Sequence, residues 1–75
     1  MTKRITATFS NGIVISRPAT EKNARYRFGW RVWGGATNGP AEGFASTREG
    51  AERTANTERR MRGSTHIEIV EAIHP

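Results

Sequence analysis

The chain has 75 residues, with twelve Lys and Arg against seven Asp and Glu and a net charge of +5. It contains no cysteine, which excludes disulfide bonds and thiolate metal sites. No apolar run approaches the roughly 20 residues that span a bilayer, and residues 5–9 alternate like a strand instead of forming a signal peptide. We therefore expect one soluble cytoplasmic domain over residues 1–75 with a thin core, since chains of this size bury only about 60% of their unfolded surface.

The first elements in the chain form a predicted β-hairpin. Residues 5–9 alternate apolar and polar side chains, Asn11-Gly12 follows, and a second apolar run extends from Ile13 until Pro18 ends the strand. A two-residue turn would put Ile13 on the opposite face from Phe9, whereas a three-residue loop at residues 10–12 with a left-handed Gly12 pairs Phe9 with Ile13. The longer loop is preferred because it gathers five apolar residues on one face: Ile5, Ala7, Phe9, Ile13 and Ile15.

After a polar connector, the third predicted strand covers residues 25–33 and reads Arg-Tyr-Arg-Phe-Gly-Trp-Arg-Val-Trp. Side chains of a strand alternate between two faces. One face therefore supplies the main aromatic layer of the core, with Tyr26, Phe28, Trp30 and Val32. The other face carries three guanidinium groups and an indole, from Arg25, Arg27, Arg31 and Trp33. Such a face suits phosphates, carboxylates or an acidic protein surface.

A glycine-rich loop over residues 34–40 and a short optional strand at residues 43–45 precede one predicted helix over residues 47–62. Ser46 is the expected N-cap because Glu49 follows three residues later, and Gly63 is the expected C-cap. The inward stripe of the helix is weak and consists mainly of small residues, with Ala51, Thr54, Ala55, Glu58, Met61 and Arg62 as its candidates. A last strand follows over residues 65–73, with Ile67, Ile69 and Ile73 on one face.

The order of elements is therefore β-β-β-(β)-α-β. This order predicts an α+β fold with a single antiparallel sheet of four strands, or five if residues 43–45 form one, and one helix packed on its apolar face. The other face of the sheet would stay open to solvent and would present the arginines of the third strand.

Two groups of basic residues are candidates for binding, and the alternative for each is an ordinary solvated face. The leading group is Arg25, Arg27, Arg31 and Trp33. Arginine can hold a nucleic-acid backbone while an aromatic ring stacks on bases, and the same residue types form hot spots of protein interfaces. The second group lies at the end of the helix and is the part of the helix expected to touch phosphate: Arg59, Arg60 and Arg62.

No residue pattern predicts catalysis, a metal or a cofactor. His66 and His74 are the only histidines, and no carboxylate pair beside them is spaced like a metal site. No set of nucleophile, base and orienting residue can be proposed from spacing. The glycine-rich loop also lacks the Lys-Ser/Thr of a P-loop. We therefore expect a non-enzymatic protein.

Three features resemble short proteins encoded by phages and prophages: residues 5–12, the pair Trp30 and Trp33, and the approach to the helix at residues 43–46. Small phage proteins of this size often bind and block host machinery, and anti-CRISPR proteins are one such group. The resemblance implies a stoichiometric inhibitor. Because the chain is basic, an acidic mimic of nucleic acid is not expected. The order of sheet and helix also resembles the arm-type DNA-binding domains of phage integrases, except for the last strand at residues 65–73.

The sequence leaves two main functions open. The first is a phage-type protein that inhibits or redirects a host protein or nucleoprotein complex through the basic and aromatic face of the sheet. The alternative is a module that binds DNA or RNA directly, contacting phosphates with arginine and stacking with Trp33. A structural or oligomeric virion component is a third, weaker hypothesis, and a homodimer is compatible with each of them.

Overall fold

The computed structural model describes residues 3–35 and 39–75, and within them the chain forms five strands and one helix. In chain order these are β1 (Arg4–Thr8), β2 (Val14–Pro18), β3 (Phe28–Trp33), β4 (Ala41–Ala45), α1 (Arg48–Arg62) and β5 (His66–Glu71). Strands β1 and β2 form one antiparallel sheet, while β3 lies between β4 and β5 in a second antiparallel sheet. The α+β class is as predicted, and the short strand considered at residues 43–45 is present as part of β4. The prediction of a single sheet is wrong.

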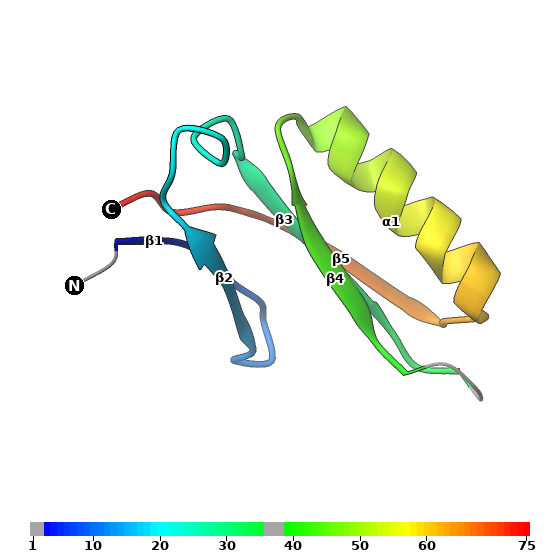
Figure 1. Cartoon of the computed structure of the whole chain (residues 1–75). Coiled ribbons are helices and arrows are strands. Elements are labelled where there is room, and N and C mark those ends of the chain that lie inside the picture. The colour runs from blue at the N-terminus through cyan, green and yellow to red at the C-terminus, as the bar shows by residue number, and fades with distance from the viewer. Residues whose placement is uncertain (1–2, 36–38) are drawn as a thin grey trace.

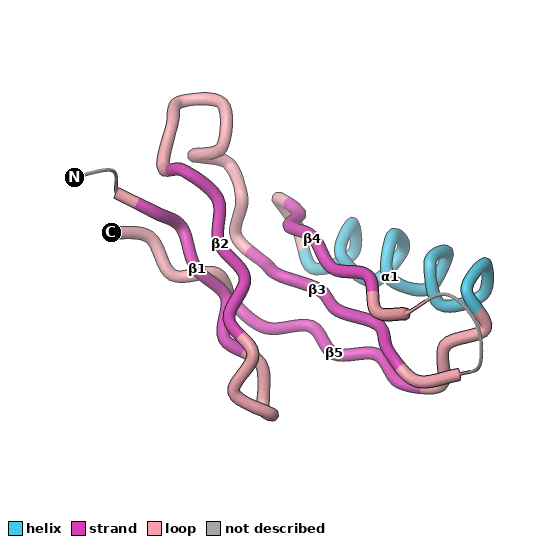
Figure 2. The backbone as a smooth tube through the Cα atoms, turned by 60° about the horizontal axis from the view of Figure 1, so that its bottom comes forward, coloured by secondary structure: helices cyan, strands magenta, loops and turns pink. Residues whose placement is uncertain are grey.

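The two sheets and the helix form three layers (Figure 1). Helix α1 covers one face of the three-stranded sheet, where Trp30 and Val32 pack with Ala51 and Ala55 of the helix. The β1–β2 hairpin lies on the other side of that sheet (Figure 2). On this side a Cβ atom added to Gly29 would lie 2.5 Å from the Cβ of Ala7 in β1. The face that was predicted to stay open to solvent is therefore covered by the hairpin.

The hairpin has the predicted loop and the predicted register. The Phe9 amide donates to the Ile13 carbonyl at 2.9 Å, and Gly12 has a left-handed φ of 88°. Ala7 pairs with Ile15, so the apolar residues of both strands share one face. This result confirms that burying one continuous apolar face decides between two turn lengths.

The hairpin packs on the sheet because both surfaces carry apolar side chains toward each other. Ala7, Phe9 and Ile15 form a buried cluster, against which Phe44 of β4 and Val70 of β5 pack. Since Phe44 and Val70 point away from α1, the three-stranded sheet has apolar groups on both faces, and both faces need cover. An edge-to-edge extension of the sheet would have left the second apolar face in water.

The segment after β5 joins the two sheets. Ile73 forms an isolated antiparallel bridge with Thr6 of β1, with N–O distances of 3.0 and 2.7 Å. The strand predicted over residues 65–73 therefore ends at Glu71, and its last part pairs with the hairpin instead of β3. Ile73 was predicted to share a face with Ile67 and Ile69, but it lies in the bridge to β1 and its side chain is 63% exposed.

Helix α1 starts one residue later than predicted because Thr47, and not Ser46, is its N-cap. The Thr47 hydroxyl accepts a hydrogen bond of 2.9 Å from the Gly50 amide. Gly63 is the C-cap as predicted, with a left-handed φ of 66°. Two members of the predicted inward stripe are exposed, Thr54 and Met61. The buried stripe of α1 consists of Ala51 and Ala55 and is therefore narrower than predicted. The small side chains of these two alanines let the helix approach the sheet closely.

Replacing Thr47 by alanine should lower the free energy of unfolding by about 1 kcal/mol, the usual cost of losing an N-cap side chain. Ser46→Ala is the matched control, since its hydroxyl makes no cap and the variant should unfold like the parent. Chemical denaturation followed by circular dichroism measures both. A larger loss of stability for Ser46→Ala than for Thr47→Ala would show that Ser46 is the N-cap.

Candidate functional site

The structure separates the four candidate residues predicted for the third strand. Strand β3 begins at Phe28, so Arg25 and Arg27 lie in the preceding connector, residues 19–27. The connector is a series of turns in which the Tyr26 amide donates to the Asn23 carbonyl at 3.1 Å. Both arginines are exposed. The predicted strand over residues 25–33 is therefore three residues too long at its start.

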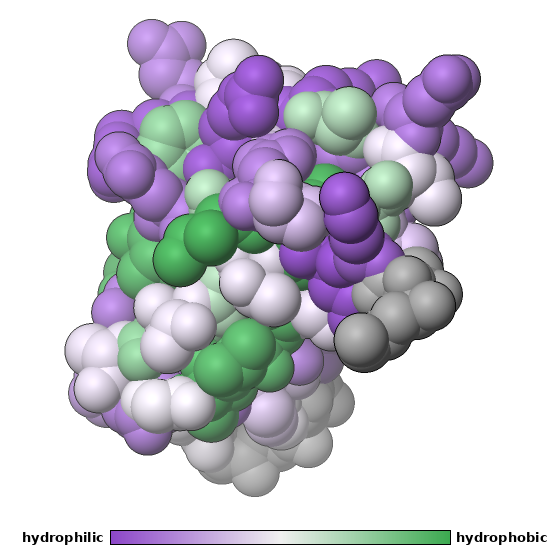
Figure 3. Space-filling model, turned by 90° about the vertical axis from the view of Figure 1, so that its left-hand side faces the viewer, coloured by the Kyte–Doolittle hydropathy of each residue, from purple (hydrophilic) through white to green (hydrophobic). Residues whose placement is uncertain are grey.

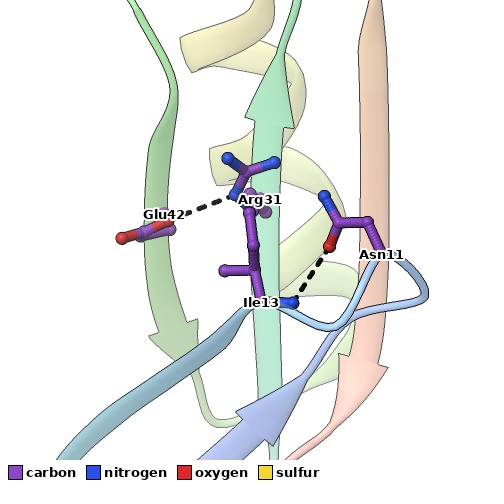
Figure 4. A network of polar contacts seen from close by, with 4 residues as sticks. All are labelled: Asn11, Ile13, Arg31 and Glu42. Carbon is purple, nitrogen blue, oxygen red and sulfur yellow. Dashed lines mark hydrogen bonds and ion pairs between the residues drawn. The ribbon is translucent and has the colours of Figure 1, made fainter.

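Arg31 lies between the two sheets and is not a surface residue (Figure 4). It is 7% exposed, and its Nε atom lies 3.3 Å from Oε2 of Glu42 on β4. The hairpin loop with Asn11 and Ile13 lies in front of β3 beside Arg31, and there the Ile13 amide donates to Oδ1 of Asn11. Arg31 is thus buried beside the exposed carboxylate of Glu42 and is shielded from an external phosphate.

Glu68 lies on β5, the other neighbour of β3, and binds the hairpin loop. Its carboxylate accepts hydrogen bonds from the amide and the hydroxyl of Ser10, each 3.0 Å long. Arg31 is paired in register with both Glu42 and Glu68, which places opposite charges on neighbouring strands. The two glutamates were not among the predicted functional residues, because their position beside Arg31 follows only from the strand register.

Trp33 is half-buried at the end of β3, and its neighbours are groups of the same chain. Its ring stacks on that of His66, with centroids 5.3 Å apart and planes at 13°. The guanidinium carbon of Arg31 lies 5.1 Å from the centre of the indole. The glycine-rich loop over residues 34–40, which follows Trp33, is described only in part, since residues 36–38 lie outside the described ranges.

A different group of arginine and aromatic side chains meets at the connector. The guanidinium carbon of Arg17 lies 5.6 Å from the centre of the Phe44 ring. The Phe44 ring stacks on that of Tyr26, with centroids 5.7 Å apart. The guanidinium carbon of Arg25 lies 5.8 Å from the centre of the Tyr26 ring. We call these four residues the arginine–aromatic stack: Arg17, Phe44, Tyr26 and Arg25.

The fold brings the stack together from three segments that are far apart in the sequence. Arg17 comes from the end of β2, Phe44 from β4, and the other two residues from the connector. The connector is fixed at both ends, since the Asn23 side chain donates to the Pro18 carbonyl at 2.9 Å and His74 hydrogen-bonds the Tyr26 carbonyl. Tyr26 was predicted to lie in the main core, and this prediction is wrong because the strand begins after it.

The positive charge of the molecule is concentrated in this region. Residues 1–27 contain six basic residues and one acidic residue, Glu21, whereas residues 28–75 contain six of each. The whole net charge of +5 therefore belongs to the hairpin and the connector. Within residues 3–35 and 39–75, the ion pairs are Arg31–Glu42 and Arg62–Glu58, and neither involves a residue before β3. The exposed arginines of the connector region are thus not compensated by carboxylates.

The second predicted cluster lies apart from the stack, at the far end of α1 (Figure 1). Arg59, Arg60 and Arg62 occupy the last turn of the helix, where basic side chains favour the negative end of the helix dipole. Nε of Arg62 lies 3.9 Å from Oε1 of Glu58. These arginines contribute to the helix itself and lie apart from Arg25 and Arg27. Trp33, in contrast, lies near the end of α1, since its carbonyl accepts a hydrogen bond of 3.0 Å from the amide of Thr65, just after the C-cap.

Comparison with known protein families, with characterised proteins and with solved structures found no match to this chain. In the part of the chain that the structure describes, no three His, Asp or Glu side chains form a group able to hold a metal ion. Its helix is too short and too polar to cross a membrane. Function is therefore argued from the charged surface around the connector.

Proposed function

We propose that this chain is a non-enzymatic module that binds nucleic acid by the phosphate backbone. The surface that would bind it is formed by the connector and the end of β2. We call it the connector surface, and it comprises the stack together with two further basic residues: Arg17, Lys22, Arg25, Tyr26, Arg27 and Phe44. The observation that carries the proposal is that the whole net charge resides in residues 1–27, where the described arginines have no carboxylate partner.

The physical basis is the attraction between a localised positive field and a dense line of phosphates. A basic patch on one face raises the local concentration of a polyanion and releases the counterions that surround it. Arginine suits this role better than lysine because its planar group donates two parallel hydrogen bonds to a phosphate. Figure 3 shows hydrophilic side chains over the upper part of the face turned away from α1, the end where Figure 1 places the connector.

The test is a titration of labelled duplex DNA by fluorescence anisotropy at several salt concentrations. Binding that neutralises Z phosphates should give a log–log slope of about −0.9Z. Arg17→Gln and Arg25→Gln should each weaken binding and make the slope shallower by about one. Arg53→Gln removes the same charge from an exposed position on α1 and is the matched control.

Two results would count against the proposed function. A slope near zero would mean that no phosphates are neutralised. An equal loss in the Arg53→Gln control would mean that the total charge matters and the connector surface does not.

A second candidate function, capture of a host protein as a phage-type inhibitor, is favoured by the outer face of the hairpin. Val14 and Ile73 are 56% and 63% exposed there, and Thr6 and Thr8 lie between them in the strand register. Figure 3 shows hydrophobic atoms among pale, less polar ones on this face. A tagged pull-down with and without nuclease separates the two functions, because a protein partner would survive nuclease treatment.

A further inference from the structure

The arginine–aromatic stack indicates which part of a nucleic acid the connector surface contacts. We infer, on the basis of the proposed function, that this surface binds the sugar–phosphate backbone and stacks on no base. Its two rings serve as platforms for guanidinium groups of the same chain. The ligand class is therefore a phosphodiester chain of any sequence, including one that lacks bases.

The first step of the argument concerns the rings. Aromatic residues that stack on bases in single-strand binding proteins offer a free ring face to each base. Phe44 and Tyr26 are half-buried, and each ring already has one ring neighbour and one guanidinium neighbour. A base that stacked on either ring would have to compete with these neighbours. Because one favourable contact would replace another, stacking of a base would add little to the binding free energy.

The second step concerns the guanidinium groups. Arg17 is oriented twice, by its contact with Phe44 and by a 2.9 Å hydrogen bond from its Nη1 to the Ser16 carbonyl. A guanidinium group that lies over a ring keeps its N–H donors at its edge, where a phosphate can accept them. Orienting the group before the ligand arrives lowers the entropy lost on binding. The ring pair thus holds two arginines of different segments ready for phosphate.

The third step concerns the surroundings of the stack. Lys22 and Arg27 are exposed in the same connector, and Nη1 of Arg27 lies 3.5 Å from Nε2 of His74. Glu21 is the single acidic residue in the first 27 residues. These charges extend the field around the stack but add no free aromatic face. The connector surface therefore attracts phosphates by its positive charge and can donate paired hydrogen bonds to them, but it offers nothing that would recognise a base.

The experiment compares three labelled single strands of about 20 nucleotides, which exceeds the site of one small domain: oligo-dT, oligo-dA and a strand of abasic residues. Fluorescence anisotropy at one low salt concentration gives the dissociation constant for each. We expect the three constants to agree within about twofold, because the contacts are to phosphates. Inorganic polyphosphate should displace all three strands.

A loss of about fivefold or more on the abasic strand would overturn the inference, since that is the least effect expected from one stacked base. The proposed function would survive that result, because the strands with bases would still bind. Failure of all three strands and of duplex DNA would instead refute the proposed function. The two failures are therefore distinguishable.

Arg17→Lys tests the platform itself, because it keeps the charge and removes the planar fork. The variant should bind all three strands more weakly and by the same factor. Arg53→Lys on α1 is the control and should bind like the parent. Unchanged binding by Arg17→Lys would overturn the role of the oriented guanidinium group.

Discussion

Replacing Trp30 by alanine is expected to remove a large part of the stability of the protein and to lower its unfolding midpoint strongly. Trp30 is 6% exposed and packs against Val32 and the two buried alanines of α1. Its ring lies directly on β4, where a Cβ atom added to Gly43 would meet it at 2.9 Å. Removing a buried tryptophan costs about 3–5 kcal/mol. A domain of this length has a total free energy of unfolding of about 4–11 kcal/mol, so the expected loss is a large fraction of that stability.

Thermal and chemical denaturation followed by far-ultraviolet circular dichroism measures this loss. Trp33→Ala is the matched control, because the same side chain is removed from the same strand at a half-buried position. It should cost clearly less and leave a cooperative transition. Equal losses for the two variants would contradict the assignment of Trp30 to the layer between the sheet and α1.

Features that depend on neighbouring residues in the chain could be predicted from the sequence. The loop after Phe9 follows from the position of Gly12 and from the burial of one apolar face. The end of α1 follows from Gly63, which readily adopts the left-handed conformation. The alternation within β3 correctly assigns Trp30 and Val32 to one face and Arg31 to the other. Each of these follows from turn chemistry or side-chain period within a few residues.

The arrangement of the two sheets could not be predicted in this way. Whether a hairpin extends a sheet or packs on its face depends on contacts between distant segments. Here the deciding contacts are the close approach of Ala7 to Gly29 and the apolar side chains that β4 and β5 direct away from the helix. Strands with short, mixed patterns do not reveal that both of their faces are buried.

The same limit explains the outcome for the candidate site. A strand pattern cannot distinguish a solvated arginine from one that is buried beside a carboxylate, and Arg31 is the latter because Glu42 is its partner in register. The concentration of charge in residues 1–27 is visible in the sequence. The stack is not, since Arg17 and Phe44 lie on strands of different sheets.

Gly29→Ala should destabilise the protein strongly, and a second substitution should restore it. The added methyl group would lie 2.5 Å from the Cβ of Ala7, closer than real Cβ atoms approach. Either the hairpin must shift away from the sheet or β3 must move, and overpacking of this kind costs about 1–3 kcal/mol. The substitution tests directly whether the hairpin packs on the face of the three-stranded sheet.

The compensating change is Ala7→Gly, which removes the atom that the new methyl group meets. The next contact of that methyl group is with Cδ1 of Ile15 at 3.6 Å, an ordinary van der Waals distance. The double variant Ala7→Gly/Gly29→Ala should therefore regain much of the stability that Gly29→Ala loses. Glycine within β1 should keep the recovery incomplete. Denaturation of the parent, the two single variants and the double variant forms a double-mutant cycle whose coupling energy should clearly exceed that of independent sites. Additive losses would mean that residues 7 and 29 are not in contact, and the hairpin would then have to lie elsewhere than on β3.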